Sequence, residues 1–127
     1  MTMHHNQPEI QNLMSRYFDG LYHSDSTTLR TVFHADLAYV NATPGNYEFL
    51  GLDAYMARID ARTPPASRND PRAETIERIA LKGDRIGIVE ARMTMMGRDY
   101  QDLLTVINTD EGWQVLTKVF SFVAEKG

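Results

Sequence analysis

The sequence contains no cysteine, so disulfide bonds, thiolate catalysis and cysteine-ligated metal sites are all excluded. Basic residues are not in excess either: the net charge is -4, which argues against a nucleic-acid or anionic-membrane partner. No apolar run approaches the roughly 18 residues of a membrane span. The segment Met1–His5 is polar and lacks the apolar core of a signal peptide. We therefore expect a cytoplasmic protein that binds neither nucleic acid nor membrane.

Histidine is scarce, and its spacing to the carboxylates matches no metal site, so we predict no metal and no cofactor. His4 and His5 are interpreted as part of a frayed terminus. His34 lies two residues before Asp36 and has two interpretations. It is either a proton shuttle that uses the carboxylate, or a residue at a helix end that bonds locally, and we favour the second.

What the sequence does contain is typical of one globular domain. Apolar residues make up 43% of its 127 residues and charged residues 24%, which is enough apolar material to bury a core. No repeat, linker or low-complexity segment divides the chain. We predict a single domain over residues 1–127.

The first half of the chain is predicted to hold three helices and two short strands. Apolar residues recur there at helical spacing, capping oxygens precede the second helix, and consecutive prolines end the third. The predicted segments are a helix over 8–23, a second helix after Ser24–Ser26, strands over 36–40 and 47–51, and a helix over 51–61.

The second half is predicted to be a meander of four antiparallel strands. These strands cover 73–82, 86–96, 100–109 and 113–123, with glycine-containing turns between them. The spacing of Ile76 and Ile79 breaks strict alternation and predicts a bulge. Helices followed by a meander indicate an α+β fold, in which a strongly curved sheet wraps the helices and leaves a hollow.

The closing hairpin places one carboxylate, Asp102, and one amine, Lys118, inside apolar strands. If Thr109 lies opposite Trp113, Asp102 shares a face of the sheet with Lys118. If Asn108 lies opposite Trp113, the two side chains lie on opposite faces, because a slip of one residue reverses every side chain. Trp113 itself is predicted to anchor the hairpin by packing.

The order of elements resembles the nuclear transport factor 2-like (NTF2-like) superfamily, which has a cone-shaped, cystatin-like fold with three N-terminal helices in a curved mixed or antiparallel sheet. The likeness rests on residues 16–25, Leu29, residues 33–36, Asp102–Thr105 and Gly112–Phe120. Within the superfamily the chain looks most like the SnoaL-like, putative lumazine-binding group. The alignment favours the register that places Lys118 on the convex face.

The superfamily includes ketosteroid isomerase, and the resemblance implies roles for two residues. Tyr17 falls on the tyrosine that donates to the oxyanion in that enzyme, and Asp102 lies in the strand that carries its neutral aspartic acid. The position of the catalytic base falls on Asn41, whose amide cannot take a proton from carbon. His34 or Asp36 would then have to act as the base.

The resemblance implies a small-molecule-binding protein with a hydrophobic, cone-shaped pocket. Two interpretations stay open: a SnoaL-like lyase or isomerase with Tyr17 and Asp102 as catalytic donors, or a non-catalytic binding or accessory protein. The expected ligand is a small apolar or aromatic molecule, and a homodimer is expected through the sheet face, with Val115, Val119 and Val123 or their neighbours in the interface. The predicted ligand-binding residues are Tyr17, Phe18, Phe33, Asn41, Tyr55, Asp102 and Lys118.

Two further groups have alternative interpretations. Met93, Met95 and Met96 are core fillers or line the pocket, and the core is the simpler interpretation. The arginines around the two prolines, Arg58, Arg62 and Arg68, belong either to a solvated loop or to a site for an acidic ligand, and we favour the loop.

Overall fold

The computed structural model describes residues 7–124 of the chain, so the prediction for His4 and His5 lies outside the described residues. Three α-helices, one 3-10 helix and six strands follow one another along this part. Their bounds are α1 Gln7–His23, α2 Ser26–Val32, β1 Phe33–Asn41, β2 Glu48–Leu50, α3 Leu52–Ala61, η1 Pro65–Arg68, β3 Ala73–Lys82, β4 Ile86–Met95, β5 Arg98–Thr109 and β6 Gly112–Ala124.

The helices form for the reasons read from the sequence. The buried face of α1 carries Ile10, Leu13 and Met14, spaced as one helical stripe. The Asp25 carboxylate accepts a hydrogen bond from the Thr28 amide at 3.1 Å and caps α2. A Cβ on Gly20 would lie 2.6 Å from Leu29 Cδ2, so glycine allows α1 and α2 to pack closely. None of the described helices is long and apolar enough to cross a membrane.

The strands form one mixed sheet in the order β2-β1-β6-β5-β4-β3. Strands β3 to β6 are the predicted antiparallel meander, and the predicted bulge is confirmed between Ile76 and Arg78. Strand β1 is longer than predicted and pairs with β6 in parallel, while β2 adds an antiparallel edge. The predicted α+β class with three helices and a curved mixed sheet is confirmed, although the curvature does not close the sheet.

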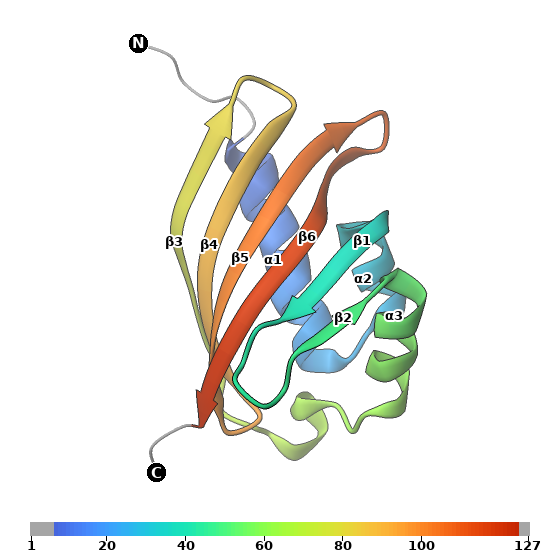
Figure 1. The fold of residues 1–127 in the computed structure, drawn as a ribbon, viewed down its shortest axis with the longest axis vertical. Helices are drawn as coiled ribbons and strands as arrows, with labels where there is room; N and C mark the ends of the chain where they lie inside the picture. Colours follow the sequence, from blue (N-terminus) through green and yellow to red (C-terminus); the bar gives the residue numbers. More distant parts are fainter. Residues whose placement is uncertain (1–6, 125–127) are drawn as a thin grey trace.

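The helices occupy one side of the sheet. In Figure 1, α1 passes behind the long strands and α2 and α3 lie beside β1 and β2, so the sheet face turned to the viewer carries no described helix. Inward residues of β4 such as Val89, Ala91 and Met93 alternate with more exposed ones and pack against the helices in one core. This arrangement creates an inner, covered face and an outer, open one.

The closing hairpin contains both of the registers that the sequence left open. Asn108 lies opposite Trp113 near the turn, which is the register favoured by the superfamily alignment. The pairing then shifts by one residue between Val106 and Thr105, so Leu104 lies opposite Lys118. The extra residue is Leu116, a bulge that sequence alternation alone did not reveal. The expectation that Lys118 lies on the convex face is therefore wrong, and Lys118 shares the inner face with Asp102.

The same shift corrects the predicted interface residues. Val115 is fully buried on the inner face, where it pairs with Val106, and cannot belong to an open sheet face. Val119 and Val123 are exposed, as a role on the outer face requires. Trp113 is 5% exposed, which confirms that it packs in the core.

Candidate functional site

A pocket of about 330 Å³ opens between the inner face of the sheet, the end of α1 and α3. Its wall combines aromatic rings and methionine side chains with four cationic residues and one acidic residue. The residues that line it are Leu21, Tyr39, Asn41, Asn46, Glu48, Tyr55, Arg58, Arg62, Met93, Met95, Met96, Arg98, Tyr100, Lys118, Phe120 and Phe122. A concave site with apolar walls and a few convergent polar groups is the usual form of a small-molecule site.

Lys118 is the most deeply buried cation of this pocket, and only 4% of it is exposed. Its ammonium nitrogen lies 4.8 Å from the centre of the Tyr17 ring and 5.1 Å from that of Phe120. It also donates a hydrogen bond to the Tyr55 hydroxyl at 3.3 Å. The ring faces stabilise the positive charge by cation–π attraction. Burial raises the pKa of Tyr55, so this hydroxyl keeps its own proton.

Tyr17 and Asp102 form a buried pair behind Lys118. The Tyr17 hydroxyl donates a short hydrogen bond to Asp102 Oδ2, while Asp102 Oδ1 has no hydrogen-bond partner among the described residues. Burial, together with the negative charge of Asp102, holds the pKa of Tyr17 well above its ordinary value. Tyr17 is therefore a proton donor and not a base at neutral pH.

The structure divides the predicted ligand-binding residues into two layers. Asn41, Tyr55 and Lys118 line the pocket. Tyr17, Asp102, Phe18 and Phe33 are buried but do not line it. The second layer supports the first, because Tyr17 packs against Phe33 and Phe33 against Tyr55, with ring centroids 5.9 Å and 5.5 Å apart. The Tyr17–Asp102 pair therefore does not line the pocket itself. Its contact with the lining is made by the Tyr17 ring, over which the Lys118 ammonium lies.

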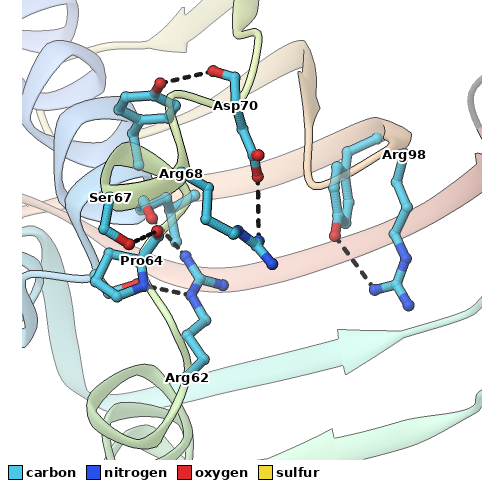
Figure 2. A network of polar contacts seen from close by, with 10 residues as sticks. Arg62, Pro64, Ser67, Arg68, Asp70 and Arg98 are labelled. Atoms are coloured by element: carbon cyan, nitrogen blue, oxygen red, sulfur yellow. Dashed lines mark hydrogen bonds and ion pairs between the residues drawn. The ribbon is translucent and has the colours of Figure 1, made fainter.

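Arginine side chains surround the mouth of the pocket. Arg58 forms a two-pronged ion pair with Glu48, with a distance of 2.6 Å between Nη2 and Oε2, and this bonding raises the pKa of Arg58. Arg62 is half-buried, donates to Ser24 Oγ at 2.8 Å and to the Leu21 carbonyl, and has its pKa lowered by burial. Arg98 stacks on Phe122 at 4.2 Å. Figure 2 shows Arg62 and Arg98 with the network of the η1 segment.

The substitute bases suggested from the sequence do not line the pocket. His34 Nδ1 accepts a hydrogen bond from the Asp36 amide at 2.9 Å, which confirms the local role favoured for it. Asn41 Oδ1 accepts from the Thr43 amide at 3.0 Å and so fixes the chain after β1. The pocket-lining carboxylate is Glu48. In residues 7–124, no group of three or more histidine, aspartate or glutamate side chains could hold a metal ion.

Sequence reasoning missed Glu48, Tyr39, Tyr100 and Phe120 as pocket residues. Two of them carried a usable signal, because Tyr100 is two residues before Asp102 and Phe120 two residues after Lys118, on the same faces of their strands. Tyr39 lies in β1 and Glu48 in the three-residue β2, and tertiary packing decides which side of the sheet these strands turn to the helices. Met93, Met95 and Met96 line the pocket, so the simpler core interpretation was incomplete.

Comparison with known proteins supports the fold and one family. Residues 5–121 match the model of a family described as putative lumazine-binding. Among curated proteins, none matches the sequence. Solved structures with the same fold include an NTF-2 like protein of unknown function from Silicibacter pomeroyi DSS-3, which is 20% identical with a TM-score of 0.80 and covers 97% of this chain and 100% of its own.

Two other solved structures are similar. An NTF2-like protein of unknown function from Shewanella baltica OS155 is 18% identical with a TM-score of 0.81, over 98% of this chain and 100% of its own. A ketosteroid isomerase-like protein from Erwinia carotovora atroseptica is 13% identical with a TM-score of 0.74, over 96% of this chain and 99% of its own. At these identities the likeness establishes the NTF2-like fold.

Proposed function

The chain belongs to the putative lumazine-binding family of the NTF2-like superfamily, and from that premise we propose that it binds a small, flat, apolar or aromatic molecule in the pocket between sheet and helices. The observation that carries the proposal is the pocket itself. Its volume of about 330 Å³ suits a molecule of one or two rings, and its wall offers rings and flexible methionines for contact.

An NMR titration of the labelled protein with a set of one-ring and two-ring aromatic compounds tests this function. We expect signal shifts from the lining residues of β4 and β6 and none from the outer face. Met95→Trp should abolish these shifts by filling the pocket, whereas Ile86→Trp, on an exposed site, should leave them unchanged. If no compound in the set perturbs the lining residues, the proposed binding function is wrong.

A catalytic version has support from the Tyr17–Asp102 pair. In a lyase or isomerase, the Tyr17 hydroxyl and Asp102 in its protonated form would donate to an oxyanion that develops on a carbonyl substrate. The pair now bonds to itself, so the Tyr17 hydroxyl would have to turn from Asp102 toward the pocket. Glu48 is the candidate base among the lining residues, although its pairing with Arg58 lowers its pKa and weakens it as a base.

Exchange of deuterium into the α-carbon of simple cyclic ketones in heavy water would test the catalytic version. We expect protein-dependent exchange that Tyr17→Phe reduces by about a hundredfold, a typical loss for one oxyanion donor. Absence of exchange above the rate of buffer alone would leave the binding function and remove the catalytic one.

We also propose that the open face of the sheet forms a homodimer. Register pairs place Phe49, Val40, Val119 and Leu103 in one row across β2, β1, β6 and β5. The row continues into Glu90 and Arg78, which form an ion pair at 2.7 Å. Phe49 is 61% exposed and Leu103 45%. An apolar stripe with a charged end is suited to pack against a second copy of itself.

A further inference from the structure

The charge of the pocket is unbalanced. Four cationic side chains line it, and one carboxylate, Glu48, opposes them. That carboxylate is fully engaged by Arg58 through two hydrogen bonds. Within the described residues, Arg62, Arg98 and Lys118 have no carboxylate within 4.0 Å, because none of them occurs in an ion pair there. Cationic side chains that surround a pocket and have no carboxylate partner attract an anionic ligand.

The free-energy cost of these positive charges rises with the burial of the side chain that carries them. Arg98 is exposed, Arg62 is half-buried and Lys118 is 4% exposed. Removing a charge from water is costly unless an opposite charge or hydrogen bonds compensate for it. Lys118 has three N–H donors, and one of them is used on the Tyr55 hydroxyl. The ring faces around it compensate only in part.

Asp102 does not provide the missing partner. It lies diagonally across from Lys118 on the same face, since Asp102 pairs with Phe120 and Lys118 with Leu104. Its Oδ2 is nonetheless bonded to the Tyr17 hydroxyl, and no Asp102 oxygen comes within 4.0 Å of the Lys118 ammonium. Even if Asp102 is counted against Lys118 at longer range, Arg62 and Arg98 have no ion-pair partner among residues 7–124. The described wall of the pocket is cationic in either case.

We propose that the ligand of this pocket is an organic carboxylate with a flat aromatic or apolar body, whose carboxylate pairs with the ammonium of Lys118. The inference rests on the proposed binding function and names its ligand class. The body of the molecule lies against Met93, Met95 and the surrounding rings, while Arg62 and Arg98 favour entry of the anion through their field. One carboxylate matches the single deeply buried ammonium of Lys118, because the other cations of the wall are more exposed.

Matched pairs of probes test this inference by calorimetry: benzoate with benzamide, phenylacetate with phenylacetamide, and naphthalene-2-carboxylate with its amide. Each pair shares a body and differs in charge. We expect at least one carboxylate to bind about ten- to a hundredfold more tightly than its amide, the range for a hydrogen bond to a buried charge. Raising the salt concentration should weaken the carboxylates and leave the amides unchanged.

Lys118→Met should reduce the affinity of the carboxylate to that of its amide. Lys82→Met is the matched control, because Lys82 is exposed and does not line the pocket. Lys118→Arg keeps the charge if the methionine variant does not fold, and it should retain the preference for carboxylates. In the wild-type protein, the side-chain NMR signals of Lys118 should shift more with a carboxylate than with its amide, because only the carboxylate pairs with the ammonium.

The outcomes separate the two proposals. Amides that bind as tightly as carboxylates would overturn the anion inference and leave the binding function. A preference for carboxylates that survives in Lys118→Met, or that leaves the Lys118 signals unmoved, would overturn the assignment to Lys118. If no probe of either kind binds, both the binding function and the inference that rests on it fail.

Discussion

At the scale of single residues, the Tyr17–Asp102 hydrogen bond is the contact with the clearest energetic consequence. Tyr17→Phe removes the donor and leaves both oxygens of a buried carboxyl without a partner, which costs about 1–3 kcal/mol of unfolding free energy. Urea unfolding measures this loss. Asp102→Asn keeps an acceptor and should cost less. Tyr47→Phe, at a site that is 75% exposed, should change stability by less than about 0.5 kcal/mol.

Buried tyrosines also predict how stability depends on alkaline pH. Burial raises the pKa of Tyr17 and Tyr55 above the ordinary value of about 10, at which they ionise in the unfolded chain. Above that pH the unfolded state binds fewer protons than the folded state, so the unfolding free energy falls as pH rises. Their full contribution is present below about pH 10.

Urea midpoints measured across the alkaline range would show this decline, and absorbance of tyrosinate would show that the two buried hydroxyls ionise only as the fold opens. Tyr17→Phe should make the decline shallower, because one of the two groups no longer titrates. An unchanged slope in that variant would contradict the role given to Tyr17.

At the scale of elements, the bulge at Leu116 takes up one residue of β6, so that Val115 and Lys118 both face inward. Deleting Leu116 joins Val115 directly to Thr117, so a regular ladder results with Val115 and Lys118 still on the inner face. We expect this variant to fold with a modest loss of stability. Deleting Val119 instead reverses part of β6 and expels either Phe120 or Lys118, so it should unfold the protein.

Urea unfolding and NMR spectra of the two deletion variants make this comparison. Equal losses of stability in both would show that the bulge contributes more than an extra residue in the ladder, for example the bend of the strand.

At the scale of the whole molecule, the apolar row on the outer face predicts a dimer that one charge would disrupt. Leu103→Asp puts a carboxylate in the centre of the row beside Val119 and should convert a dimer to a monomer at micromolar concentration. Analytical ultracentrifugation measures the mass. Gln11→Asp, at an exposed site on α1 and away from the outer face of the sheet, is the control and should remain dimeric. A monomeric wild-type protein would contradict the proposed interface.

The sequence by itself determined the elements, because their signals are local. Helical spacing located α1, the Asp25 oxygens marked the start of α2, and two-residue alternation defined β4 and its inner face. The broken spacing of Ile76 and Ile79 also predicted its bulge. The α+β class follows from the order of these elements, and three residues that line the pocket, Asn41, Tyr55 and Lys118, were named before the fold was known.

Only the tertiary structure decided the charge and shape of the site. The bulge at Leu116 reflects packing of β6 against both β5 and β1, and no pattern within the strand records it. If Leu116 were paired as a regular strand residue, Lys118 would lie on the outer face and not in the pocket. It likewise took the folded chain to bring Glu48, Arg62 and Arg98 to one mouth, because they lie in separate segments joined by turns. Local periodicity determines which face a side chain shares with its neighbours, and long-range pairing determines what that face meets.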